Sequence, residues 1–277
     1  MASLVRSINI VLATLIPILG SNACSAQDST PSSQKTISLD GVLNEINVNN
    51  AISAINGDKK IVKIRIRSGG GWPEPSARLA AVIQARRLAV EVDDFCLSAC
   101  MSFIFMASPT RTVENGSILG FHYADSYDVA YLSPRFGTEG VNVQSRVDGP
   151  VRNVYRAAGI SEDLLIHQGT MLEPICWTEM SRDRSNKSLV YRYGIWMPTT
   201  ANMKAWNIDF TGAPLADILP NGPLNESGQK LIAMKLGETK PGVLPAVVIG
   251  GPNKSASSST RDKIDRCGPN LVTKVVH

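Results

Sequence analysis

The sequence has little histidine, no cluster of positive charge and no long apolar run, and each of these absences excludes some classes of protein. Only 3 of the 277 residues are histidine, so a histidine-dependent site has few members to draw on. The 28 Lys and Arg residues barely exceed the 24 Asp and Glu residues, and they form no basic run interleaved with aromatics. No zinc-finger spacing occurs, so we expect no nucleic-acid partner. With 43% apolar and 19% charged residues, the composition is that of a globular chain and not of a multi-span membrane protein.

The N-terminal segment is typical of a secretory signal. Arg6 precedes an apolar run from Ile8 to Leu19, and small residues then allow cleavage after Ala23 or Ala26. That run is too short to span a bilayer comfortably. A lipoprotein anchor on Cys24 is not expected, because Ser21 stands where such signals usually carry Leu. We therefore expect residues 1–26 to be a signal peptide and 27–36 a polar linker, with no stable membrane insertion after signal cleavage.

Export makes the cysteines disulfide-permissive. Past the signal four remain, Cys96, Cys100, Cys176 and Cys267, and the three pairings that four cysteines allow stay open. A zinc site built from Cys96, Cys100 and His122 is the competing interpretation. Its spacing matches no common zinc ribbon or finger, so we expect no metal and no cofactor.

Strand and helix patterns alternate from residue 36 to residue 122 and predict an α/β fold with a largely parallel sheet. The clearest strand is IVKIRIRS, in which Val62, Ile64 and Ile66 alternate with basic residues. The expected strands are 36–41, 61–68, 89–92 and 117–122, and the expected helices are 49–57, 76–88 and 98–107. From Val151 the pattern turns helical, with Ser161 as an N-cap and a last helix ending at Gly194, before a short strand at 195–198. Gly, Pro, Asn and Ser then dominate, which predicts an irregular C-terminal extension at 199–277.

Three pieces of this alternating region carry groups that acyl transfer requires. Ser98 lies at a predicted strand-to-helix junction, SGGG follows the strand that ends at Ser68, and His122 closes a later strand. A serine hydroxyl needs a neighbouring base, and the oxyanion needs preorganised N–H donors such as those of a glycine turn or a helix N-terminus. Segments that leave the same edge of a parallel sheet converge, so these pieces can meet. The structural alternatives are a serine that caps its helix, a buried core histidine and an ordinary tight turn.

The same pieces, IRIRSGGG, CLSAC and GFH, together with Arg111, resemble the Clp peptidase and crotonase superfamily. More closely, they resemble its exported bacterial branch of ClpP-like periplasmic proteins. The resemblance covers residues 37–198, and it implies a ClpP/crotonase-like repeated β-β-α spiral located in the periplasm or secreted. Relatives of this fold assemble as trimers or larger rings, so it also implies a homo-oligomer.

Carried over position by position, the resemblance implies that Ser98 is the nucleophile and His122 the general base. The amides of Gly70 or Gly71 and of Ala99 would form the oxyanion hole. The acid of the family follows the two-helix segment, where Glu173 is the nearest residue here and Asp163 and Asp183 are alternatives.

Two functions from different classes follow. The first is an exported serine hydrolase, peptidase-like, that acts on a peptide or small acyl substrate through an acyl-enzyme. The second is a catalytically inactive exported ClpP-like protein that serves in binding or assembly, which the lack of a cleanly aligned acid favours. An acyl-CoA reaction ranks third, because coenzyme A is not expected outside the cytoplasm.

Overall fold

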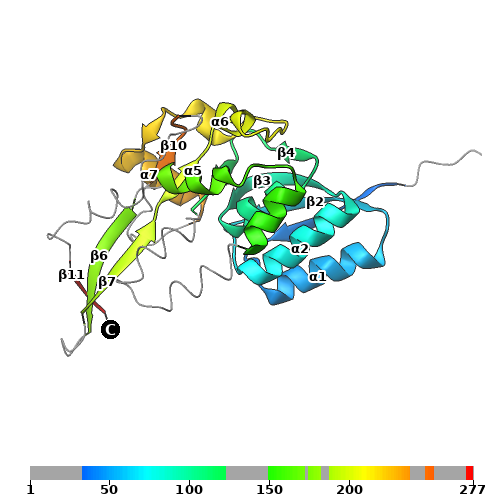
Figure 1. The fold of residues 1–277 in the computed structure, drawn as a ribbon, viewed down its shortest axis with the longest axis horizontal. Coiled ribbons are helices and arrows are strands. Elements are labelled where there is room, and N and C mark those ends of the chain that lie inside the picture. Colours follow the sequence, from blue (N-terminus) through cyan, green and yellow to red (C-terminus); the bar gives the residue numbers. More distant parts are fainter. Residues whose placement is uncertain are drawn as a thin grey trace, which may run out of the picture. The chain divides into compact units, whose positions relative to one another are not determined.

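The computed structural model describes residues 33–122, 149–171, 174–181, 187–237, 247–252 and 273–276 (Figure 1). The predicted signal peptide lies outside these residues. Within the described ranges, no helix is long and apolar enough to cross a bilayer.

The main sheet is parallel throughout, as the alternating pattern predicts. Its strands follow one another in chain order as β1 (Lys35–Asp40), β2 (Ile61–Ser68), β3 (Ala89–Leu97) and β4 (Arg111–Val113), and β5 (Ile118–Gly120) also pairs with β3. β3 is longer than expected and pairs with two further strands along its length. Residues 90–92 pair with β4 and residues 95–97 with β5, and Asp94, with a φ of 68°, lies between the two stretches.

The strand order never reverses, so right-handed crossovers place the connecting helices on the same face of the sheet. α1 (Glu45–Gly57) and α2 (Pro73–Arg86) lie side by side over the sheet in Figure 1. Ile64 and Ile66 of β2 are fully buried in the core that these helices share. On the opposite face Lys63 and Arg65 form ion pairs with acidic residues of β3 and with Glu114, which follows β4. The alternation seen in the sequence thus separates a helix-covered face from a charged one.

Both helices begin earlier than the apolar spacing predicts. The side chain of Asn44 accepts a hydrogen bond of 2.9 Å from the Asn47 N–H and so caps α1. Pro73 opens α2, where its fixed φ suits the first turn and its missing N–H costs nothing.

The prediction of a last helix ending at Gly194 is wrong. After α5 (Asp163–Met171), β6 (Pro174–Ser181) and β7 (Lys187–Tyr193) form an antiparallel pair, and β11 (Thr273–Val276) lies parallel to β6. The segment LVYRY is rich in β-branched and aromatic residues, which favour a strand once a partner strand is available.

The prediction of an irregular region after residue 198 is also wrong for the described part of it. The strand predicted at 195–198 is present as β8 (Ile195–Met197), and the elements after it are α6 (Thr200–Ala205), η2 (Leu215–Ile218), β9 (Gly222–Pro223), α7 (Glu226–Lys235) and β10 (Val247–Ile249). Thr199 and Asn225 cap α6 and α7, and several of the glycines lie in the turns between elements. The polar composition therefore marks short elements with many turns and not a lack of structure.

Candidate active site

Three chain segments leave the same edge of the main sheet and meet there. Ser68 at the end of β2 pairs with Cys96, and Leu97 at the end of β3 pairs with Gly120 at the end of β5. The glycine turn, Ser98 and His122 follow these three strand ends directly. The convergence expected from parallel strands is therefore present in the structure.

Ser98 occupies a tight turn between β3 and the helix that follows it. Its φ of 57° is a left-handed conformation that residues other than glycine seldom adopt. Its N–H donates to the Gly120 carbonyl at 3.0 Å, and its carbonyl accepts from the Ser102 N–H at 2.9 Å. Ala99, not Ser98, is the residue that precedes the helix, and no side chain caps this helix. A strained, half-buried serine on a strand–turn–helix junction is the geometry of a nucleophile elbow.

His122 faces Ser98 directly. Its Nε2 atom is hydrogen-bonded to the Ser98 Oγ atom, so the ring does not act as an isolated core histidine. The side chain is exposed at the molecular surface. Protein atoms around the ring nevertheless desolvate it, and this burial lowers the pKa of His122, while a hydrogen bond with its own backbone raises it in part. The lowered pKa keeps the imidazole neutral near pH 7, as a general base requires.

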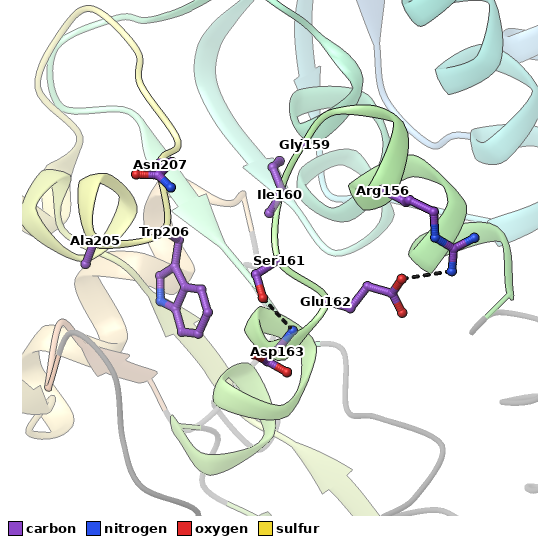
Figure 2. Close-up of a pocket in the computed structure, with 9 residues that line it drawn as sticks. All are labelled: Arg156, Gly159, Ile160, Ser161, Glu162, Asp163, Ala205, Trp206 and Asn207. Atoms are coloured by element: carbon purple, nitrogen blue, oxygen red, sulfur yellow. Dashed lines mark hydrogen bonds and ion pairs between the residues drawn. The ribbon is translucent and has the colours of Figure 1, made fainter.

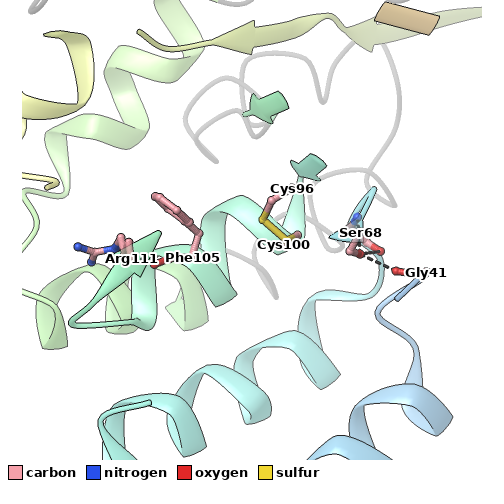
Figure 3. Close-up of a disulfide and its surroundings, with 7 residues drawn as sticks. Gly41, Ser68, Cys96, Cys100, Phe105 and Arg111 are labelled. Atoms are coloured by element: carbon pink, nitrogen blue, oxygen red, sulfur yellow. Dashed lines mark hydrogen bonds between the residues drawn. A yellow bond between two sulfur atoms is a disulfide. The ribbon is translucent and has the colours of Figure 1, made fainter. Parts of the chain in front are cut away.

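The glycine turn approaches Ser98 so closely that a side chain would not fit. A Cβ atom on Gly70 would lie 2.6 Å from the Ser98 Cβ and 2.8 Å from the Leu97 carbonyl oxygen, and Gly70 has a φ of 98°. The buried Ser68 side chain braces this turn: its hydroxyl donates to the Gly41 carbonyl at 2.6 Å (Figure 3), and it accepts the Gly70 N–H at 3.0 Å. Sequence reasoning did not anticipate this role of Ser68.

The two glycine amides therefore differ in what they offer a ligand. The Gly70 N–H is already bonded to Ser68. The Gly71 N–H has no hydrogen-bond partner in the part of the chain that the structure describes. The Ala99 N–H lies at the start of a helix, where amides have no partner within the helix. Of the two predicted glycines, Gly71 thus keeps its amide unpaired within the described residues, whereas Gly70 is the one that packs against Ser98.

The helix behind Ser98 is π-helical over Cys100–Phe105, a form that often occurs at functional sites. Arg111 holds its far end, donating to the Phe105 carbonyl at 2.8 Å and the Met106 carbonyl at 3.0 Å (Figure 3). Burial of the guanidinium lowers the pKa of Arg111 to about 10. Arg111 belongs to the residues that carry the resemblance, and in the structure its role is to hydrogen-bond the end of this helix.

Cys96 and Cys100 form a disulfide across the Ser98 turn, as Figure 3 shows. Their sulfurs are therefore not thiolate ligands, which argues against the zinc interpretation. No group of three or more His, Cys, Asp or Glu side chains within the described ranges could hold a metal ion. The side chain of Cys176 and all of Cys267 lie outside what the structure describes. The disulfide is compatible with a secreted protein.

The described residues do not identify an acid that would complete a triad with Ser98 and His122. Glu173 and Asp183 lie outside the described residues. Asp163 is exposed in the first turn of α5 and lines a pocket with Arg156 and Trp206, which Figure 2 shows, and neither Ser98 nor His122 belongs to that lining. The assignment of Glu173 stays a prediction.

Comparisons with known proteins add no family to this geometry: no protein-family model and no curated protein matches the chain. The function therefore has to be argued from the site itself.

Proposed function

We propose that the chain is an exported serine hydrolase of the Clp peptidase and crotonase type, peptidase-like, which cleaves a peptide or small acyl substrate. The observation that carries this proposal is the hydrogen bond between Ser98 and His122 at a left-handed strand-to-helix turn. The left-handed φ of Ser98 supports the proposal, because strained non-glycine residues cluster at active sites, although structural turns such as that of Asp94 carry them too. The periplasmic location and the homo-oligomer rest on the resemblance and on the signal-like N-terminus.

The chemistry follows from the positions of these groups. In the proposed mechanism the neutral His122 ring carries its proton on Nδ1, so that Nε2, the atom hydrogen-bonded to the Ser98 Oγ, takes the proton of the hydroxyl. The Ser98 oxygen then attacks the substrate carbonyl, and the resulting oxyanion is stabilised by the Gly71 and Ala99 amides. His122 returns the proton to the leaving group, and an acyl-enzyme on Ser98 remains. Water, activated by the same ring, releases the acid product.

The first test is covalent labelling with a fluorophosphonate probe, followed by mass spectrometry to locate the adduct. We expect labelling of the wild-type chain at Ser98 and none in Ser98→Ala. In His122→Ala the labelling rate should fall about 10²–10⁴-fold, the usual contribution of a general base. Ser38→Ala is the matched control, because Ser38 is an exposed serine of β1 that should not react.

Failure to label the folded wild-type chain would contradict the proposal. The site would then be the catalytically inactive, ligand-binding or assembly version of the fold. Equal labelling at Ser38 and Ser98 would also contradict it, since an activated nucleophile must outcompete ordinary hydroxyls.

A further inference from the structure

The disulfide encloses the proposed nucleophile. Cys96 lies in the last part of β3 and Cys100 is the first residue of the π-helix, so the bond spans Leu97, Ser98 and Ala99 (Figure 3). Its two Cα atoms are 5.3 Å apart. An extended chain covers about 3.3–3.6 Å per residue, so this spacing requires the backbone to reverse within the bridged segment. The residue at the reversal is Ser98, with its φ of 57°.

Other contacts of the described residues also hold this turn, among them the hydrogen bond between Ser98 and His122 and the burial of Leu97 in a second hydrophobic cluster. Two backbone hydrogen bonds hold Ser98, one to Gly120 and one from Ser102. Ser98 is not glycine, so the left-handed conformation is unfavourable and must be imposed by its surroundings. The Ser98 side chain must also fit against Gly70, where no room for another carbon atom exists. A small relaxation of the turn would therefore move the hydroxyl away from both His122 and the oxyanion amides.

We propose that the Cys96–Cys100 disulfide positions Ser98 for reaction, so that the chain is inactive as a dithiol and becomes active when this bond forms. This inference rests on the proposed function, since it concerns the reactivity of the same serine. The chain has five cysteines, and this pair is the one that brackets the nucleophile.

The activating step is thiol–disulfide exchange with a disulfide oxidant, either a protein or a low-molecular-weight compound. The two thiols of Cys96 and Cys100 lose two electrons and two protons and form the S–S bond. The oxidant gains both and leaves as two thiols. A chain synthesised in a reducing compartment would thus carry an idle serine until it reached an oxidising one.

Because the disulfide is buried, we expect it to form once and then to resist reduction in the folded protein. Cys96 and Cys100 are both fully buried, so a reductant cannot reach the folded bond without local opening. Their surroundings are apolar, since both belong to the main hydrophobic core. We therefore expect native protein to resist mild reductants, whereas the dithiol form is reached from chain that is made or refolded under reducing conditions.

The test uses a full chain in which Cys24, Cys176 and Cys267 are replaced by alanine, so that Cys96 and Cys100 are the remaining cysteines. Oxidised and dithiol forms are prepared, and each is reacted with the fluorophosphonate probe under conditions where circular dichroism shows that it is folded. Reduction should slow labelling at Ser98 on the order of 10²-fold, the scale expected for a misplacement of about 1 Å. Reoxidation with a disulfide compound should restore the rate.

A matched control separates positioning from stability. Ile55→Ala removes a buried side chain of α1, far along the chain from the turn, and lowers stability without touching the site. It is compared with Cys96→Ala/Cys100→Ala at denaturant concentrations that leave equal folded fractions. The cysteine variant should label slowly and Ile55→Ala at the wild-type rate. Equal rates in the two variants would overturn the inference.

A second readout does not depend on reactivity. Hydrogen exchange of the Ser98 and Ser102 amides, which are hydrogen-bonded in this turn, should accelerate at least about tenfold in the dithiol form, because without the disulfide the turn opens locally more often. If the oxidised chain does not label but this exchange changes, the proposed hydrolase activity fails and the positioning of the turn by the disulfide stands. If exchange in this segment is the same in both redox forms, the inference itself fails, whatever the probe shows.

Discussion

Gly70 and Ser98 each restrict the conformation of the other. Ser98 can face His122 only because Gly70 has no side chain, and Gly70 holds its φ of 98° because Ser68 binds its amide. The neighbouring Gly69 differs: a Cβ atom there would meet nothing within 4 Å, and its φ is not in the left-handed range. A side chain is therefore excluded at Gly70 but not at Gly69, and substitution of each residue by alanine can test this difference.

We expect Gly70→Ala to abolish labelling at Ser98 and to lower the free energy of unfolding by about 1–3 kcal/mol, the usual cost of a strained backbone position. Gly69→Ala should label within a few-fold of wild type. Probe kinetics and urea unfolding measure the two effects. Normal labelling of a folded Gly70→Ala chain would show that the turn does not approach Ser98 as closely as the structure has it.

At the scale of elements, the junction of α5, β8 and α6 buries a histidine that the sequence alone would place at the surface. A polar-faced helix predicts a surface position for His167, yet its side chain is only 3% exposed. Its ring centroid lies 5.1 Å from that of Trp196 and 5.3 Å from that of Trp206. Burial lowers the pKa of His167 from 6.5 to about 4. The junction should therefore respond to acid.

The sign of that response follows from proton binding. In the unfolded chain His167 takes up a proton near pH 6.5, whereas in the folded chain it does so only near pH 4, so between these values the unfolded state binds more protons. Stability should fall as the pH falls through this window, by at most about 3 kcal/mol from this residue. His167→Phe keeps a ring between the tryptophans and removes the titration. Urea midpoints between pH 7 and pH 4 should drop less steeply in the variant; identical slopes would contradict a buried neutral histidine.

The sequence predicts features that depend on a pattern within one segment, and it does not predict features that depend on contacts between distant segments. β2 alternates within itself, and SGGG, Ser98 and His122 each follow a strand, so the parallel-sheet rule sufficed to bring them together. The prediction of a helix that ends at Gly194 is wrong because the strand β7 found there is stabilised by pairing with β6, and no window of sequence displays such pairing. The left-handed φ of Ser98 and the Ser68 brace were missed for the same reason, since both depend on contacts between distant strands.

At the scale of the whole molecule, side chains of the C-terminal part of the chain pack against the residue that precedes Ser98. Leu97, which immediately precedes Ser98, is buried in a second hydrophobic cluster with Ile118 of β5 and with side chains contributed from beyond residue 198. The latter are Leu215, Ala216, Leu224, Ile232, Val247 and Ile249. β8, from before residue 198, pairs with β10 from beyond it. The sheet edge that carries Ser98 and His122 and the C-terminal elements are thus parts of one folded unit.

A chain that ends at residue 198 should therefore not fold, whereas a chain that ends at residue 252 should. The shorter chain loses Met203, Trp206 and Ile208 from the main core and the partner strand of β8. Burial of one large apolar side chain contributes about 1.5–3 kcal/mol and domains are typically stable by about 5–15 kcal/mol, so the loss of this many buried side chains removes a large share of the stability. The longer chain keeps every one of these contacts. Far-UV circular dichroism during urea unfolding distinguishes the two, because only a folded chain shows a cooperative transition. A cooperative transition and labelling at Ser98 in the shorter chain would mean that the hydrolase fold is complete by residue 198 and that the C-terminal elements are an addition to it.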